Sequence, residues 1–157
     1  MDKEIIQQYT ARISQCNKSQ LVVVVYEAMI DYIKSGKASY EAGDVTEFIS
    51  DMKHAQNLLA DLMGALNYQY EISNQLFSLY LFWNKQISTA IVKKNTESLE
   101  RIENMMIKMK DAFLKVSSED KSAPIMQNTQ KVYVGLTYGR ESLSEMADVD
   151  VNRGFQA

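Results

Sequence analysis

Apolar residues recur at steps of three and four along four long stretches of this chain, and this spacing constrains its fold most. Such steps return to one face of an α-helix, whereas a strand returns to the same face every two residues. Glycine and proline are scarce, with six and one in 157 residues, so the turn residues of a multi-stranded sheet are lacking. The sequence therefore predicts an all-α protein of long helices with short connections.

The first long helix is predicted over residues 18–41. Asn17 is a favourable N-cap, and Gln20 follows three residues later, as in a capping box. The β-branched run over 21–25 is typical of a strand, but the apolar spacing of four continues beyond it, so we expect packing to override propensity. The repeat is formed by Leu21, Val25, Met29 and Ile33. Gly43 is expected to end the helix.

Three further helices follow the same pattern. The second is predicted to begin with Asp44 as N-cap, the third to span residues 74–93, and the fourth to begin with Thr96 as N-cap. Their apolar seams are Phe48, Met52, Ala55, Leu59, Leu62 and Leu66; Leu76, Tyr80, Trp83, Ile87 and Ala90; and Leu99, Ile102, Met106, Met109, Phe113 and Val116. Short connections make sequence neighbours antiparallel, which predicts an antiparallel up-down four-helix bundle.

Two flanking segments complete the predicted organisation. Residues 3–15 form a short amphipathic helix that is marginal alone and must dock on something. After Val116 a polar linker leads to an apolar segment over residues 127–146. We therefore expect a bundle with an N-terminal helical segment over residues 1–116, and a linker with a C-terminal extension over 117–157.

The chain offers few residues for catalysis or metal binding. It has one histidine, His54, and one cysteine, Cys16, which is expected to be an apolar filler. A di-iron bundle needs an acid-x-x-His pair twice, so Asp51 with His54 cannot complete one. No glycine-rich phosphate loop is present. Glu100 and Glu103 are predicted to be solvated surface charges. We expect no enzyme activity, no metal and no cofactor.

Charge and hydropathy narrow the function further. The net charge is −3 without a basic stripe, which argues against a nucleic-acid partner. The longest apolar run, residues 21–26, is far too short to span a bilayer, and the polar residues 1–4 are unlike a signal peptide. We therefore expect a cytoplasmic protein without a membrane span.

Aromatic residues and methionines are numerous for a bundle of this size. The chain has nine tyrosines and nine methionines, and a small bundle cannot bury every aromatic ring. Exposed apolar surface marks a partner site, and flexible methionines suit surfaces that adapt to a partner. The predicted partner-binding residues are Ile6, Tyr9, Ile13, Leu21, Val25, Tyr26, Leu79, Tyr80, Trp83 and Met105.

Several short motifs occur in order between residues 9 and 116. They are the run 21–28; the turn Gly43-Asp44; the stretch 54–59; Leu76, Leu79 and Tyr80; Ile87, Ala90, Thr96, Leu99 and Ile102; and Phe113. With their spacing held, this ordered set resembles the flagellin export chaperone family, FliS. One departure is Asn17-Lys18, where the family has serine-proline.

The resemblance implies a non-enzymatic function. Such chaperones hold the disordered C-terminal segment of flagellin in the cytoplasm, prevent its polymerisation and deliver it to the flagellar export gate. Binding of this kind places an apolar partner segment in grooves between bundle helices. The alternative is a helical interaction or dimerisation module without an export role, and a homodimer is compatible with either.

The two flanking segments suggest self-competition. We hypothesise that at least one of them, the helix around Tyr9 or the segment around 132–146, covers a groove that the client later occupies. The alternative is that the C-terminal segment packs as permanent structure.

Overall fold

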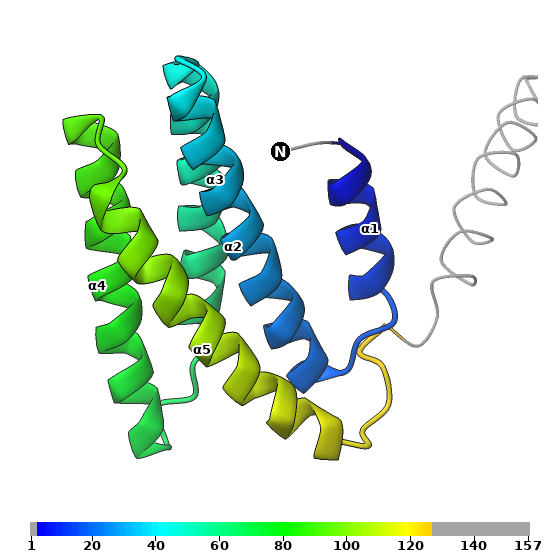
Figure 1. Cartoon of the computed structure of the whole chain (residues 1–157). Coiled ribbons are helices and arrows are strands. Elements are labelled where there is room, and N and C mark those ends of the chain that lie inside the picture. The colour runs from blue at the N-terminus through cyan, green and yellow to red at the C-terminus, as the bar shows by residue number, and fades with distance from the viewer. Residues whose placement is uncertain (1–2, 127–157) are drawn as a thin grey trace, which may run out of the picture.

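The computed structural model describes residues 3–126, and this part of the chain is all-helical, as predicted. The helices are α1 (Lys3–Ile13), α2 (Lys18–Glu41), α3 (Val45–Gly64), α4 (Glu71–Lys93) and α5 (Glu97–Glu119). Figure 1 shows the four long helices as one bundle, with α5 crossing it obliquely and α1 standing beside α2. The predicted apolar segment over 127–146 and the last residues, 148–157, lie outside the described residues.

The predicted bounds of α2 are confirmed. The Asn17 side chain accepts a hydrogen bond from the Gln20 amide at 2.8 Å, and the Gln20 side chain accepts one from the Asn17 amide at 3.1 Å. The β-branched run is helical because α2 has apolar neighbours on more than one side, so tertiary packing outweighs strand propensity. Gly43 adopts a φ of +84°, the left-handed conformation that ends the helix.

The beginnings of α4 and α5 differ from the prediction. Helix α4 begins three residues early, and Ser73 is buried there with its hydroxyl donating to the Asn67 carbonyl at 2.6 Å. The Thr96 side chain makes no capping hydrogen bond. Instead the side-chain oxygen of Asn95 accepts a hydrogen bond from the Glu97 amide at 2.6 Å. Asn95, one residue before the predicted cap, therefore accepts a hydrogen bond from a backbone amide that the helix itself leaves without an acceptor.

The predicted end of the last helix near Val116 was wrong. Helix α5 continues to Glu119, with Ser117 buried and Val116 57% exposed. The buried Ser117 hydroxyl donates to the Leu114 carbonyl at 2.8 Å, so this polar group is satisfied without water inside the last turn of the helix. The proposed division between bundle and extension therefore moves beyond residue 119.

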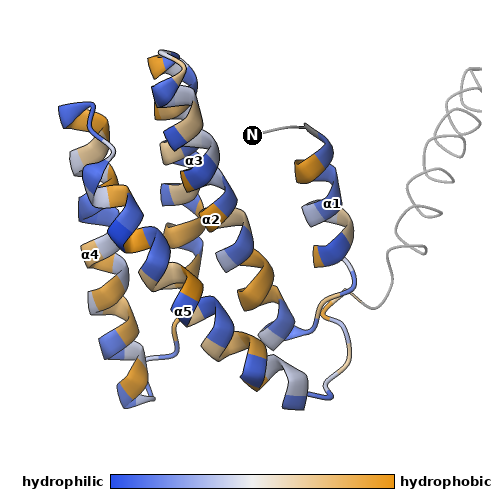
Figure 2. Ribbon diagram, in the orientation of Figure 1, coloured by the Kyte–Doolittle hydropathy of each residue, from blue (hydrophilic) through white to orange (hydrophobic). Residues whose placement is uncertain are grey.

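The core is built from the apolar sides of α2, α3, α4 and α5. Figure 2 shows orange and blue residues alternating along these helices, as expected when one side of each helix is buried. Phe48, Met52 and Trp83 are among the side chains with no exposed surface. Within residues 3–126 no helix is both long and apolar enough to cross a membrane.

Gly36 marks a close approach of α2 and α3. A Cβ atom at this position would lie 2.6 Å from the terminal methyl of Met52 and 3.3 Å from the Cβ of Asp51. Both neighbours are buried, so a larger side chain must displace them. Glycine is therefore used here for helix packing, although it lowers helix propensity.

Substitution of this glycine tests the contact. Gly36→Val is expected to lower the free energy of unfolding by about 2 kcal/mol, because overpacking of a core typically costs 1–3 kcal/mol. Gly64→Val is the matched control, since nothing lies within 4 Å of its Cβ position. Urea unfolding followed by the fluorescence of Trp83 measures both. Equal losses in the two variants would contradict the close approach.

Candidate partner-binding site

The structure separates the predicted partner-binding residues into two groups. Those with part of their side chain accessible are Ile6, Tyr9, Ile13, Leu21, Val25, Leu79 and Met105. Of these, Val25, Leu79 and Met105 pack against the main core, and Ile6, at 41%, is the most exposed. The remaining three, Tyr26, Tyr80 and Trp83, are at most 2% exposed.

The three buried aromatics form the centre of the core and offer no surface to a partner in this conformation. Tyr26 packs edge-on against Trp83 with ring centroids 6.1 Å apart, and its hydroxyl lies 2.8 Å from that of Tyr80. Burial, together with this hydrogen bond, raises the pKa of Tyr26, so the phenol stays neutral. The burial of these rings was not evident from the sequence, because an apolar stripe does not reveal how wide a buried face is; their role in partner binding stays a prediction.

Helix α1 is attached to α2 by polar contacts. The Tyr9 hydroxyl donates to the Asp31 carboxylate at 2.6 Å, and the Arg12 guanidinium lies 2.6 Å from the Glu27 carboxylate. Burial and the nearby Asp31 carboxylate raise the pKa of Tyr9, so the hydroxyl keeps its proton and remains a donor. These contacts fix where α1 lies along α2.

An apolar surface lies on the same side of α2 as these contacts. Val24 and Ala28 fall one helical turn before Glu27 and Asp31, and all four therefore share one face. Val24 and Ala28 are buried, yet neither belongs to the main core cluster. We call Val24, Glu27, Ala28 and Asp31 the α1-facing surface. Helix α1 is bound to this face through Tyr9 and Arg12, beside apolar side chains that lie outside the main core cluster.

A groove runs beside this surface between α1, α2 and the end of α5. It encloses about 490 Å³. The side chains along it include Arg12, Cys16, Val23, Val24, Glu27 and Leu114. We call it the α1–α5 groove. Its lining combines apolar side chains with the charged Arg12 and Glu27, a composition that suits an amphipathic segment.

The chain after α5 folds back onto the connection between α1 and α2. The carboxamide of Asn17 donates to the carbonyls of Asp120 and Ser122 at 3.0 and 3.4 Å. The amide of Ile125 donates to the Cys16 carbonyl at 3.0 Å. We call residues 120–125 the latch, because they tie the end of the bundle to the beginning of α2.

Asp120 supplies the charged contact of the latch. Its carboxylate accepts hydrogen bonds from the Ser19 hydroxyl and the Ser122 amide. These hydrogen bonds lower the pKa of Asp120 to about 2, so the carboxylate is ionised throughout the neutral range. Little in the sequence indicated these latch contacts, since the polar residues over 117–122 resembled an ordinary linker.

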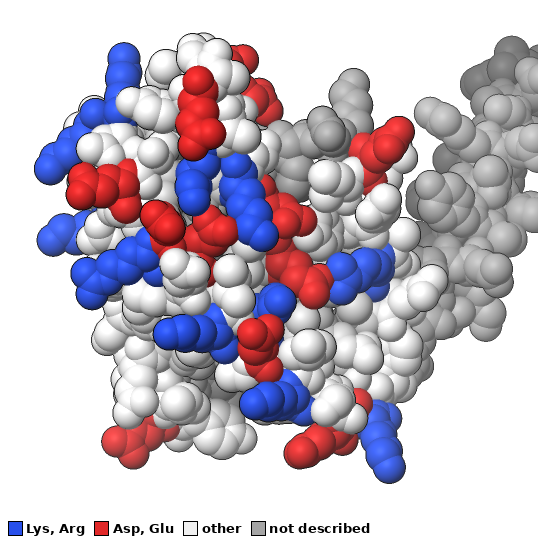
Figure 3. All heavy atoms as spheres, in the orientation of Figure 1, with Lys and Arg blue, Asp and Glu red and all other residues white. Residues whose placement is uncertain are grey.

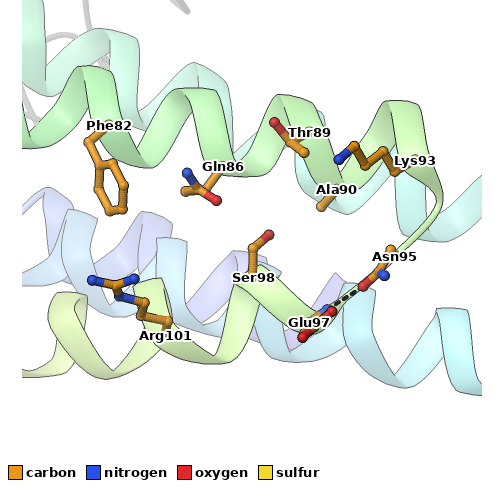
Figure 4. A pocket seen from close by; sticks show the side chains of 9 residues that line it. All are labelled: Phe82, Gln86, Thr89, Ala90, Lys93, Asn95, Glu97, Ser98 and Arg101. Carbon is orange, nitrogen blue, oxygen red and sulfur yellow. Dashed lines mark hydrogen bonds between the residues drawn. The ribbon is translucent and has the colours of Figure 1, made fainter.

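A second groove, of about 390 Å³, lies between α4 and α5. Figure 4 shows Phe82 and Gln86 of α4 facing Ser98 and Arg101 of α5 across it. Two of its nine lining residues, Phe82 and Ala90, are apolar, and none of the predicted partner-binding residues contributes to it.

Of the candidate residues for chemistry, Cys16 lines the α1–α5 groove, whereas His54 lies in neither groove. The His54 ring is exposed and stacks on Tyr32, with centroids 5.0 Å apart. No group of three His, Cys, Asp or Glu side chains within residues 3–126 is placed to hold a metal ion. The prediction that Glu103 is a solvated surface charge was wrong: its side chain is 13% exposed and pairs with Lys37 of α2 at 3.1 Å.

Charges are mixed on the face of the molecule drawn in Figure 3. Lysine and arginine side chains alternate with aspartate and glutamate across it, and no large area of one sign stands out. A surface of this kind lacks the electrostatic footprint of a nucleic-acid site.

Comparison with known proteins agrees with the resemblance noted in the sequence. Residues 1–120 match the model of the family described as flagellar protein FliS. The flagellar secretion chaperone FliS of Bacillus subtilis (strain 168) is 22% identical over 101 residues, which cover 64% of this chain and 76% of the relative. The family match takes in all five helices of the described residues and stops at the latch. The chain therefore belongs to the FliS family.

Proposed function

We propose that this protein is a cytoplasmic export chaperone for flagellin. It binds the C-terminal segment of flagellin, prevents premature polymerisation and delivers the client to the flagellar export gate. The observation that carries the proposal, beside family membership, is the α1-facing surface: buried apolar side chains outside the main core, on the face of α2 to which the short helix α1 is bound. A helix of the client would take the place of α1 there, in helix-in-groove recognition.

Helix α1 has the properties of a replaceable cover. It has 11 residues, fewer than an isolated helix needs for stability in water. Its ion pair with α2 joins Arg12, whose side chain is 50% exposed, to Glu27. Exposed ion pairs contribute about 0–1 kcal/mol to stability. The Tyr9–Asp31 hydrogen bond is then the strongest polar contact holding it.

A longer client segment can bind this surface with a more favourable free energy than α1 does. Each buried Leu- or Met-sized anchor contributes about 1.5–3 kcal/mol, so a longer amphipathic helix with several anchors outcompetes a short one. The client orders on binding, and part of the contact energy offsets that ordering.

Calorimetry with the full chain and a peptide of the flagellin C-terminal segment tests the function. We expect 1:1 binding with a negative heat-capacity change, because apolar surface is buried. Lack of binding to every flagellin of the same organism would exclude the chaperone proposal. Self-association in place of binding would favour the dimerisation module.

Substitution of Tyr9 tests the exchange of helices. Tyr9→Phe removes the hydrogen bond to Asp31 and is expected to tighten flagellin binding up to about tenfold, since a cover that docks less often competes less. Tyr40→Phe is the matched control: it removes a hydroxyl that donates to the Lys94 carbonyl at 2.6 Å, far from α1 along α2. Unchanged or weaker binding of the Tyr9 variant would contradict the exchange.

A further inference from the structure

We propose that residues 127–146 of the chain dock into the α1–α5 groove of the same molecule. The groove shares Val24 and Glu27 with the α1-facing surface, but the docking segment lies beyond the part of the chain that the family match covers. Three features of the described residues support it: where the latch ends, which side chains stand exposed there, and what lines the groove.

The latch brings the chain to the edge of the groove. The Ile125 amide is bound to the carbonyl of Cys16, and Cys16 is itself one of the residues that line the groove. The described part of the chain therefore ends beside the groove. Figure 1 shows this end of the chain passing next to the connection between α1 and α2.

Exposed apolar side chains gather at the same end of the molecule. Leu114, which lines the groove, is 50% exposed. In the latch and directly after it, Ile125 and Met126 are 48% and 51% exposed. Half-exposed apolar residues beside a groove are typical of a surface that another segment covers.

The sequence of the segment fits the chemistry of the groove. Its apolar residues are Val132, Tyr133, Val134, Leu136, Tyr138, Leu143 and Met146. Val23, Val24 and Leu114 offer the apolar side of the groove. Lys131 and Arg140 flank residues 132–139, which contain no acidic residue, so this part of the segment would bring no carboxylate near Glu27; Glu141 and Glu145 follow it.

The tether makes even a weak contact effective. Five residues, 127–131, separate Met126 from Val132, and these six Cα-to-Cα steps can span up to about 20 Å. The stretch of α2 from Gln20 to Glu27, which lines the groove, is only about 10 Å long. A short linker gives an effective concentration in the millimolar range, so a segment of modest affinity occupies its groove.

The single cysteine of the chain reports on this contact. Cys16 lines the groove and is 8% exposed, so a docked segment should restrict access to its thiol. The test compares full-length protein with a full-length variant carrying Val132→Ser, Leu136→Ser and Tyr138→Ser. We expect an aromatic disulfide reagent to react about tenfold faster with the variant. A chain ending at Met126, which keeps the latch, should react like the variant, and a peptide of residues 127–146 should slow it again.

Two controls separate access from other causes. Burial raises the pKa of Cys16, so rates are measured over a range of pH to correct for the thiolate fraction. Urea unfolding followed by Trp83 fluorescence establishes that the proteins compared are equally stable. Equal or slower labelling of the serine variant overturns the proposal. Protection that rises with protein concentration also overturns it, because the segment would then dock on a second copy. No flagellin is present, so these outcomes are independent of the proposed function.

Discussion

Trp83→Ala is expected to lower the free energy of unfolding by about 3–5 kcal/mol, as truncation of a buried tryptophan does. The ring has no exposed surface and packs against Tyr26 and Tyr80 with centroids 6.1 and 5.7 Å apart. Domains are stable by only about 5–15 kcal/mol, so this one change removes much of the total. Urea unfolding followed by far-ultraviolet circular dichroism measures it, because the variant has no tryptophan left.

Two companion variants make the result specific. Leu81 lies on the same helix but is 47% exposed, so Leu81→Ala is expected to lower the free energy of unfolding by less than about 1 kcal/mol. The indole nitrogen of Trp83 has no hydrogen-bond partner within residues 3–126. Trp83→Phe therefore removes part of the buried ring system but no hydrogen bond. It should lower the free energy of unfolding clearly less than Trp83→Ala does. If Trp83→Ala and Leu81→Ala were equally mild, the aromatic core described here would be wrong.

Asn17→Ala is expected to lower the free energy of unfolding by about 2–3 kcal/mol, more than the loss of an ordinary helix cap does. The cap itself contributes about 1 kcal/mol. The side chain is 3% exposed and also donates to the carbonyls of Asp120 and Ser122, which lose this donor in the variant. Asp120 is half-buried and Ser122 exposed, so each of these hydrogen bonds contributes about 0.5–1.5 kcal/mol. Urea unfolding followed by Trp83 fluorescence measures the sum.

A second substitution separates the cap from the latch. Asn17→Asp keeps an oxygen that accepts from the Gln20 amide but turns a carboxylate oxygen toward two carbonyls, so the latch should open while α2 stays capped. Faster hydrogen exchange at the Ile125 amide would report the opening. Asp44→Ala is the control at an exposed cap with one hydrogen bond to the Glu47 amide, and should cost about 1 kcal/mol. Equal losses for Asn17→Ala and Asp44→Ala would show that the latch adds nothing.

These contacts also give a physical reason for a sequence departure. Where the FliS family was expected to have serine-proline, this chain has Asn17-Lys18. A serine hydroxyl has one donor hydrogen, whereas a carboxamide has two donors and an acceptor. Asparagine can therefore cap α2 and hold two carbonyls of the latch together, which a serine at the same position cannot do.

The local features of the fold were determined by the sequence. The bounds of α2 follow from the Asn17–Gln20 capping box and from Gly43, whose conformations depend on residues a few positions away. The seam of α3 was correct for Phe48, Met52, Ala55, Leu59 and Leu62, which are all buried. Periodicity gives the direction of an apolar face because helix geometry fixes it.

Only the tertiary structure decided how wide each face is and what covers it. Tyr26 and Tyr80 are 54 residues apart, and each ring is buried because the other helix lies against it. Asn17 meets the Asp120 carbonyl across 103 residues, so a stretch that resembled a linker became a latch. Tyr9 reaches Asp31 only after α1 has turned back along α2. Helical spacing orients a side chain around its own axis, whereas burial depends on neighbours that arrive from distant parts of the chain.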